Sequence, residues 1–190
     1  MQRIRAVMGR AFSLLLIVGC VAGAFYGANW VLTDPKTPLP RQWNPVQPLL
    51  VSDPITPVTR LKLANTLASD QACLSVLATA QVQATARPDL VDSQVCHIKG
   101  RTTLGGLGEV RVRPVETRCE TALRMAMWVE HGLQPAARNI FGQPLGAIDH
   151  FSSYNCRAIR TTQGDTNKMS THATADAIDI SGFRLADGQR

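Results

Sequence analysis

The stretch that decides the fold is Ser170-Thr171-His172-Ala173-Thr174-Ala175-Asp176-Ala177-Ile178-Asp179. It places an imidazole and a carboxylate seven residues apart, around a turn of small residues that leads into an apolar strand. A neutral histidine nitrogen and an aspartate oxygen are common ligands of Zn²⁺, and a catalytic zinc site needs three protein ligands with water in the fourth position. The stretch can therefore hold part of a zinc site, with His172 and Asp179 as two of the ligands. Taken without its surroundings, the pair is more often a surface histidine and an aspartate at a strand end.

The chain around this stretch predicts helices mixed with short strands. Apolar residues at helical spacing, cap residues and helix-ending glycines mark the helices, and short apolar runs mark the strands. The expected elements are two short helices within residues 58–80 with Ser69 or Asp70 as the cap between them, a helix over 117–131, a helix from Pro135 to Phe141, strands at 145–150 and 177–183, and a polar loop at 164–168. This order predicts a mixed α+β domain.

The glycine-rich segment Gly105-Gly106-Leu107-Gly108 does not have the setting of a phosphate-binding loop. A dinucleotide-binding loop follows a strand and opens a helix. Here the glycines precede an alternating run, residues 109–113, which reads as a short strand ended by Pro114. We therefore expect a turn at the glycines.

Length and composition indicate one domain of ordinary size with an appendage. The chain has 190 residues, and its 45% hydrophobic content is enough for a core. The net charge of +6 favours polyanions, but the lysines and arginines are dispersed, without the basic, aromatic-interleaved run that nucleic-acid binding needs. Nucleic acid is therefore not an expected partner. An acidic surface polymer, an anionic membrane, and a solvated basic surface without a specific partner stay open.

Residues 11–32 carry no charge and follow a basic N-terminal segment, residues 1–10. About 20 apolar residues span a bilayer, and Lys and Arg stay on the cytoplasmic side. We expect a single-pass transmembrane anchor with a cytoplasmic N-terminus and Trp30 near the outer interface. A cleaved signal peptide is the alternative, since its apolar core takes only about 7 to 15 residues, and Cys20 ends a segment that resembles a loose lipoprotein processing site.

Residues 33–57 hold seven of the eleven prolines. Such a segment favours the extended polyproline II conformation and resists packing into a core. We expect a linker that holds the domain, residues 58–190, away from the membrane. The alternative is that Trp43, Leu49 and Leu50 pack this segment against the domain, which we expect of its second half.

Four cysteines follow the apolar segment: Cys73, Cys96, Cys119 and Cys156. An even number suits an oxidising compartment outside the cytoplasm, where disulfides persist. Four cysteines allow three connectivities. Their spacing favours Cys73 with Cys96 and Cys119 with Cys156. A metal site built from cysteines is disfavoured because no CxxC pair is present.

The motif and its flanking segments resemble a known family. Ser170, His172, Ala177 and Asp179 fit the pattern S-x-H-x-x-G-x-A-x-D of D-alanyl-D-alanine carboxypeptidase and dipeptidase type zinc peptidases, with Ala175 in place of the glycine. More closely, the chain from Leu133 onward resembles the bacterial extensin-like C-terminal family, which commonly has alanine there. The segments that carry this resemblance are Gln134-Pro135-Ala136-Ala137-Arg138, Ser153-Tyr154-Asn155-Cys156-Arg157, His172-Ala173-Thr174-Ala175-Asp176-Ala177-Ile178-Asp179 and Phe183-Arg184-Leu185-Ala186-Asp187-Gly188.

The resemblance implies a zinc D-Ala-D-Ala peptidase-like α+β fold, a small mixed sheet with flanking helices. It implies Zn²⁺ as the cofactor and periplasmic peptidoglycan peptides as the substrate. By the resemblance, His172 and Asp179 are zinc ligands, Ser170 supports the metal site, and Arg157 binds a substrate carboxylate or the developing oxyanion. The expected protein is a zinc metallopeptidase, held at the inner membrane by one helix, that hydrolyses peptide bonds of peptidoglycan in the periplasm.

The sequence departs from the family pattern near Arg190. In the family, the third zinc ligand and the general base come from a later His-x-Asp-His-x-His segment, which these residues do not contain. Residues 186–190 read as a hairpin turn, so a partner strand for 177–183 is missing as well. We therefore expect a domain that is incomplete at its C-terminal end. The alternative function is a non-catalytic envelope protein that binds peptidoglycan or a partner enzyme through the same cleft.

Two residues near the motif have a structural alternative to a role in the site. His150 lies in the strand before Arg157, and it either faces the cleft or packs within the sheet. Arg157 either serves the site or pairs with an acidic neighbour such as Asp149 or Asp165.

Overall fold

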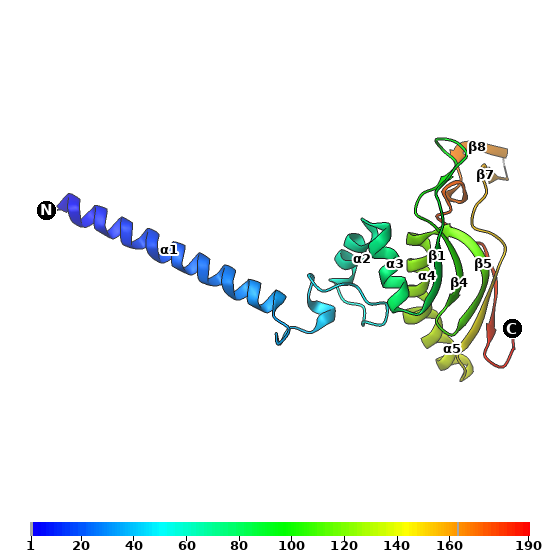
Figure 1. The fold of residues 1–190 in the computed structure, drawn as a ribbon, viewed down its shortest axis with the longest axis horizontal. Coiled ribbons are helices and arrows are strands. Elements are labelled where there is room, and N and C mark those ends of the chain that lie inside the picture. The colour runs from blue at the N-terminus through cyan, green and yellow to red at the C-terminus, as the bar shows by residue number, and fades with distance from the viewer. Residues whose placement is uncertain (1, 163) are drawn as a thin grey trace.

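A long helix and a mixed α+β body make up the chain (Figure 1). The computed structural model describes residues 2–162 and 164–190, with the side chains of all of these except 2–11 and 165–167. Helix α1, Gln2–Thr33, projects away from the body and carries the N-terminus at its far end. The remaining helices and strands gather at the other end of the molecule, where the C-terminus also lies.

Helices and short strands alternate along the body, as expected of an α+β domain. The helices are α2 (Thr59–Leu67), α3 (Asp70–Thr79), α4 (Cys119–Trp128) and α5 (Gln134–Phe141), with short helical turns η1 (Arg41–Trp43), η2 (Val129–Leu133, a π turn) and η3 (Thr171–Thr174). The strands are β1 (Val82–Ala86), β2 (Leu90–Val91), β3 (His97–Ile98), β4 (Arg101–Leu107), β5 (Val110–Arg118), β6 (Leu145–His150), β7 (Ala158–Thr161), β8 (Gly164–Met169) and β9 (Ile180–Leu185).

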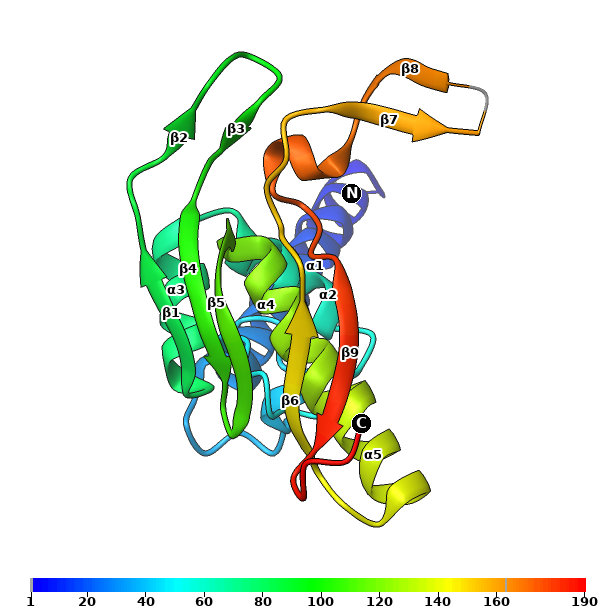
Figure 2. The same cartoon turned by 90° about the vertical axis from the view of Figure 1, so that its right-hand side faces the viewer.

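A five-stranded sheet in the order β1-β4-β5-β6-β9 forms the centre of the body, and β2-β3 and β7-β8 form two small hairpins. Neighbouring strands of the large sheet are antiparallel, except β5 and β6, which are parallel. Helices α3 and α4 cover one face of this sheet (Figure 2). The expected small mixed sheet with flanking helices is therefore confirmed. Its core contains the fully buried side chains of Leu77, Leu104, Val110, Leu123 and Ile148.

The two short helices predicted before the sheet are confirmed as α2 and α3. Ser69 caps α3, because its Oγ accepts a hydrogen bond from the backbone N–H of Ala72 at 3.4 Å. The helix predicted over 117–131 begins later, at Cys119, because the residues before it complete β5, and it continues as the π turn η2. The helix predicted near Pro135 and the strand predicted over 145–150 are confirmed as α5 and β6.

The turn predicted at the glycine-rich segment is present only at the last of its glycines. Strand β4 includes Gly105 and Gly106, and the chain turns at Gly108, whose φ is +59°. Strand β5 also continues past Pro114 to Arg118, where we expected it to end. The register between β4 and β5 shifts opposite this proline, so its missing N–H falls at an irregularity of the ladder and not within regular pairing.

The prediction of a loop over 164–168 was also wrong, since these residues belong to β8. Strand β8 pairs antiparallel with β7, and Gly164 lies opposite Thr161. Gly164 has a φ of +113°, a conformation that glycine adopts without a side-chain clash. The β7-β8 hairpin projects from one end of the body (Figure 2). Its sequence is polar, so it lacks the alternation of apolar and polar residues by which a strand is recognised.

The predicted disulfide pairing was wrong as well. The bonds join Cys73 with Cys119 and Cys96 with Cys156. The first bond links α3 to the start of α4, two helices that pack side by side on the sheet. The second links the β2-β3 hairpin to the segment between β6 and β7. Spacing along the chain could not reveal these pairs, because the tertiary fold brings distant cysteines together.

The predicted strand over 177–183 is β9, which begins later, at Ile180. It pairs antiparallel with β6, so this strand has a partner on one side. On its other side the described residues supply no strand. The turn expected after it is confirmed, since Gly188 N–H donates to the Leu185 carbonyl at 3.0 Å and Leu185 N–H to the Gln189 carbonyl at 2.8 Å.

The second half of the proline-rich segment packs on the body, as expected. Leu49 and Val51 are 3% and 5% exposed and join the core. His131, in the π turn η2, contacts the carbonyl oxygen of Val51 through Nε2 at 2.7 Å. Trp43 does not pack in this way, because it is 47% exposed.

Helix α1 contains an apolar stretch, Phe12–Thr33, with a mean hydropathy of 1.8 and none of its length buried. This stretch of 22 residues is long enough and apolar enough to span a bilayer. A signal sequence shares these properties, so the finding alone gives weak support for a single-pass anchor.

Candidate functional site

The predicted metal-site residues lie on and after the short turn η3. Ser170 precedes the turn, and its Oγ accepts a hydrogen bond from the His172 N–H at 3.3 Å. Ala175 ends the turn with a φ of +54°, in the left-handed region that favours glycine. Ala175 therefore holds a backbone conformation that a side chain disfavours and that glycine would adopt without strain.

His172 and Asp179 meet although seven residues separate them. The His172 ring is buried and its Nδ1 lies 2.7 Å from the carbonyl oxygen of Ser153. Nδ1–H therefore donates to that oxygen, because a carbonyl can only accept. The other nitrogen, Nε2, lies 3.1 Å from Oδ1 of Asp179, whose side chain is 54% exposed. The site thus presents one imidazole nitrogen and one carboxylate oxygen at an open surface.

This donor pair fits a zinc ion. An unprotonated Nε2 carries a lone pair, so its contact with the Asp179 carboxylate is attractive only when a cation, a proton or a metal ion, is shared between them. Metal-binding histidines usually donate their other N–H to a carbonyl or carboxylate, as His172 does to Ser153. Two ligands at about 2.1 Å from one tetrahedral Zn²⁺ lie about 3.4 Å apart, close to the observed separation of 3.1 Å.

Among the described residues no group of three or more His, Cys, Asp or Glu side chains could hold a metal ion. His172 and Asp179 therefore form a two-ligand site in the described part of the chain. Water or a further ligand would have to complete the coordination of a bound zinc ion.

The segment between β6 and β7 frames the site through backbone hydrogen bonds. Asp179 N–H donates to the Ser152 carbonyl at 2.9 Å, and Asn155 N–H donates to the His172 carbonyl at 2.9 Å. Ser170 N–H donates to the Arg157 carbonyl at 3.0 Å. This segment therefore holds both ends of the motif, and it also supplies the carbonyl that orients the His172 ring.

A cluster of three hydroxyl groups anchors the end of the turn to the body. The carbonyl oxygen of Ala175 accepts hydrogen bonds from Oγ1 of Thr117 at 3.0 Å and Oγ1 of Thr121 at 3.1 Å. Ser153 Oγ lies 3.0 Å from Thr117 Oγ1 and 3.4 Å from the same carbonyl. Thr117 comes from β5 and Thr121 from α4, so the turn is fixed to both layers of the fold.

We expect Thr117→Val to lower the free energy of unfolding by about 1–2 kcal/mol, because this near-isosteric change removes a fully buried hydroxyl with two hydrogen bonds. Thr121→Val is the matched control, since it removes one hydrogen bond at a less buried position and should cost less. Urea unfolding of the detergent-solubilised chain measures both values. An equal loss of unfolding free energy in the two variants would contradict the prediction that the Thr117 hydroxyl contributes more stability than the Thr121 hydroxyl.

Arg157 adjoins the motif through its backbone. Its Nη1 lies 3.3 Å from the Ala158 carbonyl, and its side chain is partly buried. Asp149, one of the partners considered from the sequence, pairs instead with Arg184 at 2.7 Å and Arg190 at 3.7 Å. The side chain of the other, Asp165, lies outside the described part of the chain. A role of Arg157 toward substrate stays a prediction.

His150 packs within the sheet and is 5% exposed. Its Nε2 lies 2.7 Å from the carbonyl of Arg113, and an Nη atom of Arg113 donates to the His150 carbonyl at 2.7 Å. Nδ1 is buried and has no hydrogen-bond partner among the described residues. The side chain therefore joins β5 to β6 past the end of their short parallel pairing.

The β2-β3 hairpin and the β7-β8 hairpin lie at the same end of the sheet as η3 (Figure 2). The Cys96–Cys156 disulfide ties the first hairpin to the framing segment, and the Tyr154 hydroxyl donates to Asp92 of that hairpin. This hydrogen bond raises the pKa of the Tyr154 phenol, since ionisation would remove the donor and place two negative charges together.

We expect Asp92→Asn to lower the pKa of Tyr154 toward its ordinary value. Because the folded chain holds this proton more tightly than the unfolded chain, the stabilisation by the hydrogen bond is present at neutral pH and disappears as the pH rises through the raised pKa. Ultraviolet titration of the phenolate in a Tyr26→Phe background reports Tyr154 alone, because the chain has two tyrosines. Identical titration curves with and without Asp92 would contradict this contact.

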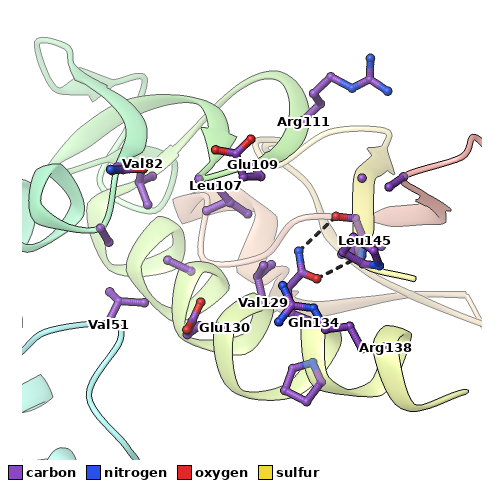
Figure 3. A pocket seen from close by; sticks show the side chains of 18 residues that line it. Val51, Val82, Leu107, Glu109, Arg111, Val129, Glu130, Gln134, Arg138 and Leu145 are labelled. Atoms are coloured by element: carbon purple, nitrogen blue, oxygen red, sulfur yellow. Dashed lines mark hydrogen bonds between the residues drawn. The ribbon is translucent and has the colours of Figure 1, made fainter. Parts of the chain in front are cut away.

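A cavity lies away from His172, between the start of α5, the β4-β5 turn and the start of β6. Its volume is about 830 Å³. Figure 3 shows an apolar floor that includes Leu107 and Val129, with Glu109 on the β4-β5 side and Glu130 on the helical side. Gln134 fixes one wall, since its amide both donates to the Leu145 carbonyl and accepts from the Leu145 N–H at 3.1 Å.

The fold and the motif together define an α+β domain with a histidine-aspartate site at one end of a mixed sheet. The chain matches the family model described as extensin-like protein C-terminus over residues 71–190, more than half of its length, and it belongs to that family. Searches of curated proteins and of solved structures found no match.

Proposed function

We propose that this chain is a zinc peptidase-like protein that is anchored in the inner membrane and hydrolyses peptide bonds of peptidoglycan in the periplasm. The observation that supports this proposal most directly is the His172 ring, whose Nδ1 is fixed by Ser153 while Nε2 faces Asp179. The match of the motif to the zinc D-Ala-D-Ala peptidase pattern links this geometry to that fold and reaction.

In this proposal each motif residue has a distinct task. His172 and Asp179 hold the zinc ion, and Ser170 maintains the backbone of the turn by accepting the His172 N–H. Bound zinc polarises the scissile carbonyl and lowers the pKa of its water to about 7. Arg157 binds a substrate carboxylate or the oxyanion through its guanidinium group.

The proposal also assigns the remaining parts of the chain. Residues 1–10 lie in the cytoplasm, residues 11–32 cross the membrane, and residues 33–57 link the anchor to the domain at 58–190. The two disulfides support an oxidising compartment, because such bonds persist outside the cytoplasm.

Zinc content and muropeptide release together test the proposal. The purified chain is dialysed against zinc, its metal content is measured, and it is then incubated with purified peptidoglycan whose soluble products are identified by mass spectrometry. We expect bound zinc and zinc-dependent products, both reduced by Asp179→Asn. Asp187→Asn, in the turn after β9, is the matched control and should change neither. Absence of both bound zinc and products from the unaltered chain would overturn the proposal.

A second candidate function, non-catalytic binding of peptidoglycan, is favoured by the cavity near α5. Four charged residues line it: Glu109, Arg111, Glu130 and Arg138. In the described part of the chain none of their side chains has an ion-pair or hydrogen-bond partner. Charges of both signs around an apolar floor suit a peptide that carries amino and carboxylate groups on aliphatic side chains, as peptidoglycan stem peptides do.

Sedimentation with insoluble peptidoglycan separates the two candidates. If the cavity binds, a Glu130→Gln, Arg138→Gln double variant loses co-sedimentation, whereas His172→Ala retains it. Arg60→Gln, on the exposed side of α2, controls for loss of a positive charge. Retention by the cavity variant together with loss of products in His172→Ala would favour the peptidase and exclude this use of the cavity.

A further inference from the structure

The end of helix α1 is tied to a short segment that follows it in the chain, residues 41–44, which we call the collar. Asn44 is 1% exposed, and its Nδ2 donates to the carbonyl oxygen of Leu32 at 2.8 Å. Its Oδ1 accepts from the Val46 N–H at 3.0 Å. Both polar ends of this buried amide are therefore used, and one of them satisfies a carbonyl at the end of the helix.

The collar is also tied to the body. Lys62, on α2, is 4% exposed and donates from Nζ to the Arg41 carbonyl at 2.7 Å. Burial lowers the pKa of this ammonium group, and the Asp53 carboxylate opposes that effect. Thr56 Oγ1 donates to the Gln42 carbonyl at 2.9 Å. The collar therefore connects the helix end to the body through side-chain hydrogen bonds on both sides.

Trp43 is the large apolar side chain of this collar, and it is not packed against the body. It is 47% exposed although Asn44, next in the chain, is buried. Ile55, which adjoins Thr56 at the collar, is 62% exposed. Trp30, one turn before the end of α1, is 46% exposed. Tryptophan favours the interface between membrane and water, because its ring is apolar and its N–H still needs a partner.

We propose that Trp43 lies in the headgroup layer of the bilayer that α1 crosses, so that the collar is a second membrane contact of the chain. This inference rests on the proposed anchoring by α1. The Asn44 hydrogen bond to Leu32 holds the adjoining residue 43 close to the end of α1, where the apolar stretch ends. The basic side chain of Lys36, between α1 and the collar, is exposed and suits a phospholipid phosphate, whereas Arg41 pairs with Asp53 at 3.5 Å.

The proposal changes the role of the proline-rich segment. A stalk would hold the body away from the membrane, whereas the collar holds it at the membrane surface. The partner is a phospholipid bilayer, and the contact needs no additional protein.

Fluorescence quenching by lipid tests this placement in the full chain. The chain has three tryptophans, so double Trp→Phe variants leave Trp30, Trp43 or Trp128 as the single reporter. Each variant is reconstituted into phosphatidylcholine vesicles with and without lipid brominated close to the headgroup. Trp128 is the matched control, because it is 44% exposed, nearly the same as Trp43, but lies at the end of α4 against Phe183.

We expect Trp43 to be quenched to a similar degree as Trp30, with blue-shifted emission, and Trp128 to be unaffected. Asn44→Ala should reduce the quenching of Trp43 and leave that of Trp30 unchanged. If Trp30 is quenched but the emission of Trp43 matches that of Trp128 in both wavelength and quenching, the proposal is overturned. If Trp30 also escapes quenching, the anchoring by α1 fails, which is a separate result.

Discussion

Replacing His172 with alanine is expected to weaken zinc binding at least 100-fold. The substitution removes the imidazole ligand and leaves Asp179, a half-exposed carboxylate, as the remaining donor of the pair. Substitution of a group that hydrogen-bonds to a zinc ligand typically costs about 10–100-fold in zinc affinity, so loss of a direct ligand should exceed that range. Competition with a chromogenic zinc chelator measures the affinity of the unaltered chain and of the variant.

Two comparisons make this result specific. His97→Ala removes a histidine from the β2-β3 hairpin outside the pair and should leave the zinc affinity unchanged. Ser170→Ala should weaken zinc binding less than His172→Ala, because it removes only the hydrogen bond that holds the turn. Zinc affinity should also fall as the pH is lowered, since protons compete with the metal for the imidazole. Equal affinity in His172→Ala and the unaltered chain would refute the metal site.

Replacing both Cys73 and Cys119 with serine is expected to lower the free energy of unfolding by about 4 kcal/mol. The two cysteines are 46 residues apart in the chain, and a crosslink of that span restricts the unfolded state by about this amount in the chain-entropy model. Both residues are almost fully buried, so the serine hydroxyls add a cost of their own. Chemical unfolding of the two proteins provides the measurement.

The outer disulfide supplies a contrast for this prediction. Replacing Cys96 and Cys156 with serine releases the β2-β3 hairpin from the framing segment but leaves the contact of α3 with α4 in place. We expect this variant to lose zinc affinity more than the Cys73, Cys119 variant does, at temperatures where both remain folded. The opposite order would show that the hairpin does not support the site.

Local signals in the sequence predicted the elements whose conformation depends on near neighbours. Ser69 marks the start of α3 because a serine cap acts within one turn, and Pro135 suits the first turn of α5. The motif predicted the meeting of His172 and Asp179 in the same way. The tight turn that ends in Ala175 is a local feature, and it brings the two side chains together.

Distant contacts account for what the sequence did not predict. The hydroxyl of Thr117 meets the carbonyl of Ala175 across 58 residues, and Ser153 reaches the same carbonyl across 22. A polar side chain at a core-facing position of a strand, as at Thr117, was the available signal, but its partner could not be named. The continuation of β5 past Pro114 depends likewise on a register shift against β4.

The two disulfides interlace, since among the four cysteines that follow the apolar segment the first pairs with the third and the second with the fourth. When the chain is exported with its N-terminal part first, Cys73 and Cys96 are exposed together before Cys119 is available. Oxidation at that stage joins Cys73 with Cys96, which is not a native pair. Reaching the native arrangement then requires thiol-disulfide exchange, in which a free thiolate attacks the incorrect bond. Maturation of this domain should therefore depend on a disulfide isomerase and not on an oxidase alone.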